Sequence, residues 1–379
     1  MGTILPLITG TIWLYIVWRF VWPLPIGIAG RAGLALVLLL AAQYHKIITL
    51  FFGTLASPEL PQWVLIILAW AFGVVLLLAL LLLLRDIVGL LAWLPARSVG
   101  RAILKGRNLG IGIGGLAVVL SAIGVWQAIK TPDIKTIAVQ IPGLSTEFDG
   151  YRIVQLTDTH ASRLLPESWQ AAVVARTNQL DPDLIVITGD LADGTPEERA
   201  ADVLPLSRLR ARDGVLAIPG NHEYYSDYIR WMPAYRALGL TMLENSHVLI
   251  PRGNATLAVA GVTDRQATAF GLPGPDLQAA LQGIPPNTPT ILLEHRPSDA
   301  PKNADSGAIA LQLSGHTHGG QILGPHLLTK MANNGFVSGF YRLGPMTLYV
   351  SNGTGLWNGL AIRLGRPSEI TQIILRPGK

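Results

Sequence analysis

The stretch LSGHTHGGQ, Leu313 to Gln321, places His316 and His318 two residues apart, between a short apolar run and a pair of glycines. In an extended segment, side chains at i and i+2 point the same way, so two neutral imidazoles can bind one object. That object can be a metal ion, a phosphate or the backbone of a hydrogen-bonded turn. The residues around other apolar runs distinguish between these possibilities.

The second half of the chain contains several short apolar runs. We expect buried strands at Arg152–Leu156, Leu184–Thr188, Gly214–Ile218, Leu257–Val262, Thr290–Leu293, Ala308–Leu313, Leu348–Ser351 and Ile370–Leu375. Helix-like segments at Pro166–Gln179 and Pro196–Leu209 separate some of these runs, and Thr195 can cap the second helix. This alternation predicts a globular α/β domain.

Polar side chains stand where many of these strands end, in the sequences LTDTH, ITGDLAD, IPGNHE, LLEHRP and LSGHTHGGQ. They are Asp158, His160, Asp190, Asp193, Asn221, His222, His295, His316 and His318. One such motif alone indicates a turn, but five of the eight histidines occupy these positions, which scattered core histidines would not do. Gly189, Gly220 and Gly315 precede three of the polar residues, and we expect them to leave room for a substrate oxyanion.

Carboxylate, imidazole and amide donors together suit Mn, Fe or Zn. Without Asp193 and His222, seven of these residues are candidate ligands, which is too many for one tetrahedral ion. They suit two ions about 3.5 to 4 Å apart that share a carboxylate, as in metal-assisted phosphoryl transfer. Asp193 fits a position outside the ligand shell better than a ligand position.

The first third of the chain has a different composition. The whole chain is 50% hydrophobic and only 14% charged, and nearly all the long apolar runs lie before residue 127. Spanning a bilayer takes about 20 mostly apolar residues. Four segments qualify: Thr3–Trp22, Gly33–Phe52, Leu60–Leu84 and Leu109–Trp126. We therefore predict a transmembrane region at 1–126, a linker at 127–135 and a catalytic domain at 136–379.

The distribution of Lys and Arg predicts the orientation in the membrane. Seven basic residues flank the first and third loops, whereas only Lys130 and Lys135 follow the fourth segment. This asymmetry places the odd loops in the cytoplasm and the C-terminal domain outside it, in a multi-pass protein of an inner or plasma membrane. Gly110 and Gly114 indicate close helix packing rather than a nucleotide loop. No basic run with interleaved aromatic residues suggests nucleic-acid binding, so the expected partners are the bilayer and a phosphorylated substrate.

His45 and Lys46 lie inside the second apolar segment. An ionisable pair inside the membrane is a functional candidate. The simpler interpretation is a shifted helix, with Lys46 extending to the interface.

The strand-end motifs, in this order, resemble those of the calcineurin-like metallophosphoesterases over about residues 136–379. The motifs are Asp158-x-His160, Gly189-Asp190-x-x-Asp193, Gly220-Asn221-His222-Glu223, His295 and Gly315-His316-x-His318. Together with HGGQ, the tail YVSNGTGLWNGLAIRLGRPSEI is most similar to the bacterial membrane-anchored branch. The resemblance implies a four-layer αββα sandwich with a dimetal site at the strand ends, here preceded by a four-helix transmembrane region.

The resemblance also implies a role for each motif residue. One divalent ion would bind Asp158, His160 and His318, and the other would bind Asn221, His295 and His316. Asp190 would bridge the two ions. His222 would be catalytic, contacting the substrate phosphate or protonating the leaving oxygen, and a metal-bridging hydroxide would be the nucleophile.

This chain departs from the commonest family pattern at Gly194, which follows Asp193 where an arginine is frequent. How the substrate is oriented is therefore not inherited with the motifs, although Arg163, Arg296 or Arg363 could meet a phosphate. The leading hypothesis is a membrane-anchored phosphoesterase or pyrophosphatase, with a lipid-linked envelope compound as one candidate substrate. The alternative is a transporter or sensor whose outer domain binds metal or a phosphorylated ligand without turnover.

Overall fold

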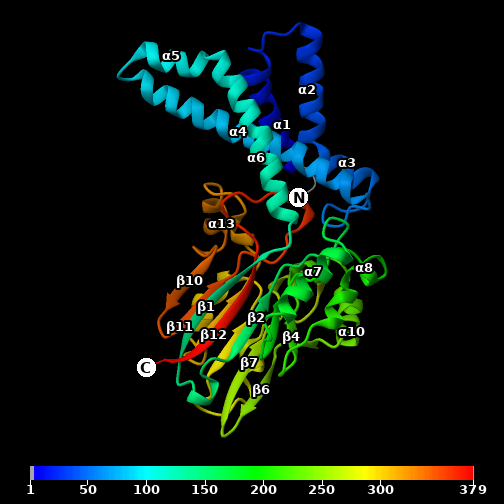
Figure 1. Ribbon diagram of the computed structural model, residues 1–379, viewed down its shortest axis with the longest axis vertical. Coiled ribbons are helices and arrows are strands. Elements are labelled where there is room, and N and C mark those ends of the chain that lie inside the picture. Colours follow the sequence, from blue (N-terminus) through cyan, green and yellow to red (C-terminus); the bar gives the residue numbers. More distant parts are fainter. Residues whose placement is uncertain (1–3, 379) are drawn as a thin grey trace. The chain divides into compact units, whose positions relative to one another are not determined.

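The computed structural model describes residues 4–378, which form two compact units (Figure 1). The helical unit comprises the chain through Ala128 together with Asn358–Leu364, and the α/β unit comprises Ile129–Trp357 and Gly365–Lys379. Thr3 and Lys379, which limit two of the expected segments, lie outside the described residues. The domain boundaries expected from the sequence stay a prediction.

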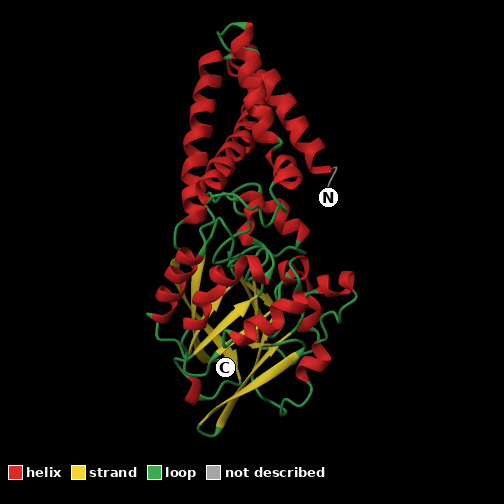
Figure 2. Ribbon diagram, turned by 90° about the vertical axis from the view of Figure 1, so that its right-hand side faces the viewer, coloured by secondary structure: helices red, strands yellow, loops and turns green. Residues whose placement is uncertain are grey.

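The helical unit contains long apolar helices and two shorter ones (Figure 2). Its elements are α1 (Ile4–Ile16), a π-helical turn (Val17–Val21), α2 (Ile28–Ala42), α3 (Tyr44–Phe51), α4 (Gln62–Trp93), α5 (Arg97–Lys105) and α6 (Arg107–Ile129). Three of the described helical segments are long and apolar enough to cross a membrane, or four if α2 and α3 form one span bent by 58°. The unit thus has the length and composition of a membrane region.

The bend between α2 and α3 lies beside His45, whose side chain is buried within the helical unit. Its Nε2 lies 2.7 Å from the carbonyl oxygen of Gly359, and the Tyr44 hydroxyl donates to the same oxygen at 3.2 Å. Close packing of the helices also uses glycine, because a Cβ added at Gly114 would come within 2.7 Å of the Phe20 ring. His45 therefore holds a backbone segment, whereas Lys46 is exposed.

The α/β unit contains two six-stranded sheets of mixed direction (Figure 1). In spatial order, the first sheet is β1 (Asp133–Pro142), β12 (Glu369–Gly378), β2 (Arg152–Leu156), β3 (Leu184–Thr188), β4 (Val215–Ile218) and β5 (Thr241–Met242). The second is β10 (Gly339–Leu343), β11 (Met346–Val350), β9 (Leu311–Ser314), β8 (Thr290–Leu293), β7 (Ala255–Gly261) and β6 (Ser246–Arg252). Strands β2, β3 and β4 run parallel to one another, as do β7, β8 and β9.

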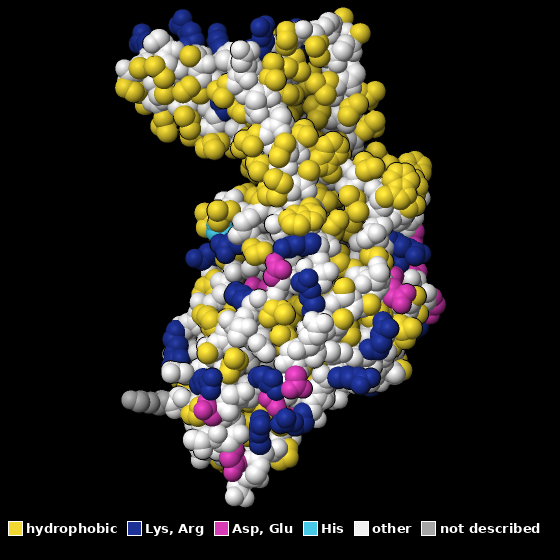
Figure 3. All heavy atoms as spheres, in the orientation of Figure 1, with side chains coloured by type: hydrophobic (Ala, Val, Ile, Leu, Met, Phe, Trp, Pro, Cys, Tyr) yellow, Lys and Arg dark blue, Asp and Glu magenta, His cyan; other side chains and the backbone are white. Residues whose placement is uncertain are grey.

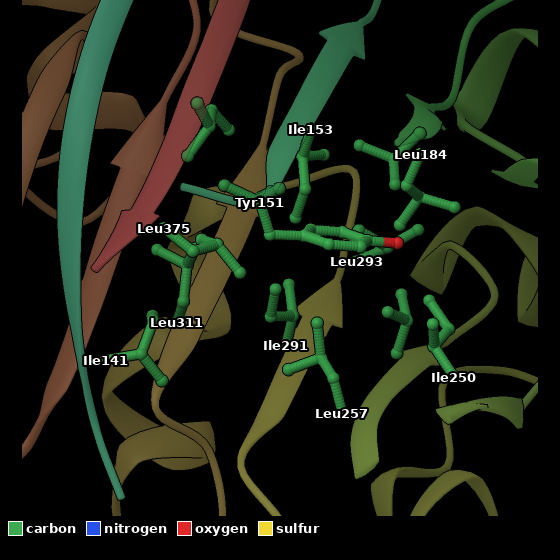
Figure 4. Packing of buried hydrophobic residues seen from close by; sticks show 14 of the residues in the cluster. Ile141, Tyr151, Ile153, Leu184, Ile250, Leu257, Ile291, Leu293, Leu311 and Leu375 are labelled. Carbon is green, nitrogen blue, oxygen red and sulfur yellow. The ribbon is translucent and has the colours of Figure 1, made fainter. Parts of the chain in front are cut away.

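The two sheets pack face to face through alternate residues of their strands (Figure 4). In β3, Leu184 and Val186 point into this shared core, and Ile291 and Leu293 of β8 meet it from the second sheet. This alternation follows from the two-residue period of a strand. The central apolar strands are buried on both faces, which is why they appear in the sequence as continuous apolar runs.

Helices cover the outer faces. The helices α7 (Glu167–Asn178), α8 (Pro196–Val203) and α10 (Tyr228–Ala237) lie beside the first sheet (Figure 1), and a second apolar cluster joins the outer face of the second sheet to α11 (Leu277–Leu281) and α12 (Ala300–Ala304). At the start of α8, Thr195 and Glu198 form the capping box that the sequence suggested at Thr195. The predicted four-layer αββα sandwich, preceded by apolar helices, is confirmed.

Candidate metal centre

The polar motifs lie in the loops that follow parallel strands of both sheets. Asp158 and His160 follow β2, Asp190 and Asp193 follow β3, Asn221 and His222 follow β4, His295 follows β8, and His316 and His318 follow β9. Carboxyl ends of parallel strands meet at one edge of a sheet. Because the two sheets also pack against each other, this edge brings both sets of side chains together: His295 Nε2 lies 3.2 Å from Asp190 Oδ2.

The backbone at this edge is held in an uncommon conformation. Five motif residues have positive φ values of 41° to 68°, namely Asp158, His160, Asp190, His316 and His318. Left-handed backbone is uncommon outside glycine and costs free energy, and it persists where the surrounding structure enforces it. Such clustering is typical of functional sites and aims these side chains into the same space.

Three groups of candidate ligands gather there, with ligand atoms within 4.8 Å of one another in each group. The first group is Asp158, His160 and His318, and the second is Asp190, His295 and His316. A third group, His160, Asp193 and His222, shares His160 with the first and contains no further expected ligand. Asn221, the seventh expected ligand, has a buried Oδ1 with no hydrogen-bond partner among the described residues. The first two groups divide the expected His and Asp ligands in the same way as the resemblance does, apart from Asp190, which was expected to bridge. The assignment of each ligand stays a prediction.

The hydrogen bonds of His295 and His160 indicate that cations fit this site. The Nδ1 of His295 lies 2.8 Å from the Thr188 carbonyl oxygen, which can only accept, so Nδ1 carries the proton. In a neutral ring the lone pair of Nε2 then faces the Asp190 carboxylate. His160 is similar, because its Nδ1 contacts Asp193 and its buried Nε2 lacks a hydrogen-bond partner among the described residues. A lone pair opposite a carboxylate needs a proton or a metal ion between them.

The pKa values of the protein groups reflect the same crowding. Burial lowers the pKa of His295, but the charge and hydrogen bond of Asp190, together with the charges of Asp158 and Asp264, outweigh burial and raise it to about 10. Burial raises the pKa of Asp190, but the neighbouring histidines outweigh it and hold that pKa well below its usual range. A divalent cation bound here would take the place of these histidine protons.

His222 is held in its orientation by two carboxylates. Its backbone N–H donates to Asp190 Oδ1 at 2.8 Å, and its Nδ1 lies 2.5 Å from Asp193 Oδ1. Asp193 thus contacts both His160 and His222, a link that its place in the sequence motif only hinted at. Since Nδ1 is held by Asp193, Nε2 is the atom of His222 that remains for a substrate.

The glycines of the motifs make room for protein groups. A Cβ at Gly220 would lie 2.2 Å from Asp190 Oδ1, and one at Gly189, where φ is 93°, would lie 2.7 Å from Gly220 Cα. At Gly315 the obstacle would be Thr157 Oγ1, at 2.1 Å. The expectation that these glycines leave space for a substrate oxyanion is therefore wrong. They let the loops after β3, β4 and β9 approach closely enough to assemble the ligands.

A buried carboxylate ties two of these loops together. Glu223 accepts hydrogen bonds from the backbone N–H groups of Gly220 at 2.7 Å, Leu191 at 2.8 Å and Asp190 at 3.1 Å. Its position directly after His222 was the only sequence signal for this role.

Arg296 and several aromatic side chains lie beside the ligands. The Arg296 guanidinium pairs with Asp264 at 2.8 Å and lies 3.2 Å from His316 Nε2, whereas Arg163 is exposed and Arg363 belongs to the helical unit. The rings of Tyr225 and Trp357 lie 5.5 Å and 6.1 Å from that of His222. Trp357 lies in the tail that resembles the membrane-anchored branch, and Tyr225 lies two residues after Glu223, but the sequence indicated a role for neither of them.

Comparisons with known proteins agree with this geometry. The sequence model of the family described as calcineurin-like phosphoesterase matches residues 151–320. A Bos taurus protein named "Transmembrane protein with metallophosphoesterase domain" is 37% identical over 302 residues, covering 76% of this chain and 67% of the relative. A Campylobacter jejuni protein named "Uncharacterized metallophosphoesterase Cj0846" is 34% identical, covering 70% of this chain and 68% of the relative.

Other relatives are matched over different shares of their length. The match covers 80% of a Bacillus subtilis protein, "Uncharacterized metallophosphoesterase YkuE", at 32% identity and over 60% of this chain. It covers 61% of a Danio rerio relative with the same name as the bovine one, at 33% identity and over 69% of this chain. Among solved structures, a 5'-nucleotidase precursor from Thermus thermophilus has a TM-score of 0.39 and 18% identity, covering 54% of this chain and 49% of that one.

The chain belongs to the calcineurin-like metallophosphoesterases. Its α/β unit is a metal-dependent phosphoester hydrolase, and its apolar helices together with the transmembrane relatives make it a membrane-associated member of the family.

Proposed function

We propose that this protein hydrolyses the phosphate or pyrophosphate of a lipid-linked substrate at the outer face of the membrane, using two divalent ions. The main observation in favour of a hydrolase is that two groups of candidate ligands lie next to each other. His160 Nε2 of the first group lies 3.7 Å from Asp190 Oδ2 of the second. Two divalent ions of the Mn, Fe or Zn class at this position would activate water and neutralise the phosphoryl oxygens. A transporter or sensor would bind the same ligand but release it unchanged.

The residues of the chain supply the remaining chemistry. Asp193 holds Nδ1 of His222, so a protonated His222 can donate from Nε2 to the leaving oxygen. Without bound metal, burial lowers the pKa of His222, but Asp190 and Asp193 together outweigh it and raise it to about 9. Tyr225 and Trp357 flank that ring and offer an apolar surface to an amphiphilic leaving group.

A lipid substrate is supported by apolar side chains exposed next to the site. The helix α13 (His326–Ala332) begins eight residues after His318, and it has no buried residue. Leu328 and Met331 on it are 70% and 78% exposed, and Leu323 before it is 64% exposed. Exposed apolar patches mark protein or membrane interaction sites. Only residues 130–132 separate α6 from β1, a connection that reaches about 14 Å at most, and this short tether favours the membrane surface as the partner.

The proposal is tested with two substrates, an aryl phosphate in solution and an isoprenoid pyrophosphate in phosphatidylcholine vesicles. The intact protein should cleave both. L328S/M331S should lower kcat/KM on the vesicle substrate about tenfold, the size expected from partial loss of two apolar insertions, while aryl phosphate cleavage stays within about twofold. The matched control is L204S/F340S, which removes two other exposed apolar side chains of the α/β unit.

Three outcomes would contradict the proposal in different ways. No turnover of either substrate by metal-loaded protein would leave a binding protein, the alternative function. Turnover of aryl phosphate alone would remove the lipid substrate. Equal losses in the two double variants would show that α13 has no special contact with the bilayer.

The outward orientation rests on the asymmetry of basic residues and has its own test. A reporter fused after the C-terminal residue should be active only outside the cytoplasm, and one inserted near Arg101 only inside it. The reverse pattern would move the substrate to the cytoplasmic leaflet.

A further inference from the structure

The helical unit contains a cavity of about 260 Å³ whose wall combines basic and apolar side chains. The π-helical turn contributes Arg19 and Phe20, α4 contributes Arg85, and the junction of α5 with α6 contributes Lys105 and Arg107. No acidic residue belongs to the described lining. Short π-helical segments recur at functional sites in helices, which draws attention to the turn that carries Arg19.

The charges of this cavity are held in place but not balanced. Asp86 accepts from Arg19 Nη2 at 2.6 Å, from Arg85 Nη2 at 2.8 Å and from the Tyr15 hydroxyl at 2.8 Å. One carboxylate therefore orients two guanidinium groups and neutralises one of them. The cavity keeps one positive charge at its inner wall and gains two more from Lys105 and Arg107 at its exposed rim.

Burying this charge has a cost that a bound anion would offset. The Arg85 side chain is only 5% exposed, and buried charges need compensation by partners. A Cβ added at Gly110 would lie 3.8 Å from Arg85 Nη1, so this nitrogen faces the glycine that lines the cavity. Planar guanidinium groups held in this way bind phosphate through paired hydrogen bonds.

The apolar part of the wall and its surroundings favour a lipid over a free anion. Phe20 and Ile111 face the same cavity as the basic groups, so a ligand with both a phosphate and a hydrocarbon chain fits it. Beside the cavity, α5 exposes Arg97 and Arg101 together with Val99, a basic amphipathic helix of the kind that lies in a membrane interface. Basic side chains gather along this edge of the helical unit (Figure 3).

We propose that this cavity binds the head group of an anionic phospholipid, with its phosphate at Arg85 and Lys105 and its hydrocarbon chain along Phe20 and Ile111. The site involves no residue of the metal centre and does not rest on the proposed hydrolase function. Basic pockets between membrane helices bind anionic head groups in this manner.

The test compares two double variants of the full-length protein, each of which loses two exposed positive charges. K105Q/R107Q removes two charges from the cavity, and R97Q/R101Q removes two from α5 outside its lining. Binding is measured in detergent by native mass spectrometry and by thermal stability, with added phosphatidylglycerol, phosphatidylcholine or inorganic phosphate. We expect phosphatidylglycerol to bind and stabilise the wild type. K105Q/R107Q should weaken this binding about tenfold or more, and R97Q/R101Q less than about twofold.

A third variant blocks the cavity without changing its charge. G110L would place a side chain against Arg85 and should also weaken phosphatidylglycerol binding by about tenfold, and replacing a glycine inside a helix favours folding. Equal weakening by the two charge variants would reduce the effect to surface attraction and overturn the proposal. Wild-type binding by G110L, equal binding of phosphatidylcholine, or equal stabilisation by inorganic phosphate would each overturn it as well.

Discussion

The two units of this protein bury histidine in contrasting ways. In the helical unit, His45 meets a single backbone carbonyl, that of Gly359, and no carboxylate lies opposite its ring among the described contacts. In the α/β unit, His295 uses one nitrogen on the Thr188 carbonyl and turns the other toward Asp190. Burial alone therefore does not identify a functional histidine. What separates the two is whether the second ring nitrogen faces a negative charge that the protein itself does not satisfy.

The same contrast holds for buried carboxylates. Asp86 in the helical unit receives donors from two arginines and a tyrosine, so its charge is matched within the protein. Asp190 receives a backbone N–H from His222 and otherwise faces imidazoles that must be protonated or bound to metal. Protein groups alone match the negative charge of Asp86, whereas the negative charge of Asp190 is matched only by cations.

The largest effect that this contrast predicts is that of Asp190→Asn. Removing the shared negative charge should lower bound metal from two ions to one or none per chain. It should also reduce aryl phosphate turnover by about 100-fold or more, because replacing a residue that only orients a ligand already lowers metal affinity or activity by about 10 to 100-fold. Metal content is measured by mass spectrometry and turnover by steady-state kinetics. The control is Asp213→Asn, which removes the carboxylate that accepts from Tyr151 at 2.6 Å. Full metal content and normal turnover in Asp190→Asn would end the dimetal assignment.

The His222→Asn variant should turn over substrate nearly as slowly as Asp190→Asn, but it should keep its bound metal. The structure places this ring beside Asp190 and Asp193. His222 shares a candidate ligand group only with His160 and Asp193, and it belongs to neither group that divides the other expected ligands. Loss of a general acid typically costs about 100-fold. If His222 protonates the leaving group, substrates with good leaving groups should lose much less than those with poor ones. Uniform loss across leaving groups, or loss of metal, would give His222 a different role.

The strands and ligands that the sequence predicted share a physical cause. The strands β2, β3, β8 and β9 are buried on both faces, so each appears as an apolar run, and the polar residues follow where each run stops. Edge strands carry no such signal. The edge strand β6 mixes polar and apolar residues and includes Pro251, which an edge strand tolerates because not every N–H must pair.

Contacts between loops that are distant in the sequence could not be predicted from the sequence. Nothing in the motif around Asp193 shows that it contacts His160 and His222 together, because that geometry depends on how the loops after β2, β3 and β4 approach one another. The expectation that Gly189, Gly220 and Gly315 leave room for a substrate oxyanion failed for the same reason. Their neighbours are protein groups from other loops, such as Asp190 beside Gly220.

Asp193→Asn gives an intermediate effect that sharpens the distinction between ligands and the groups that orient them. An amide can still contact Nδ1 of His160 and His222 but supplies no charge, so metal affinity and turnover should each fall about 10-fold to 100-fold. Excess metal should restore occupancy but not the full rate, because His222 would still be poorly oriented. Complete rescue by metal would show that Asp193 acts through His160 alone.

The smallest expected effect is in the helical unit, where it tests whether the buried His45 is structural and does not bind metal. Tyr44→Phe removes one of the two hydrogen bonds to the Gly359 carbonyl and should cost about 1 kcal/mol of stability against unfolding in detergent. His45→Phe removes the other bond and should cost a similar amount. Because neither ring nitrogen of His45 faces a carboxylate, saturating Mn²⁺ should stabilise both variants as much as it stabilises the wild type. A His45→Phe protein that loses the metal-dependent part of its thermal stability, while Tyr44→Phe retains it, would make His45 a ligand and erase the contrast between the two buried histidines.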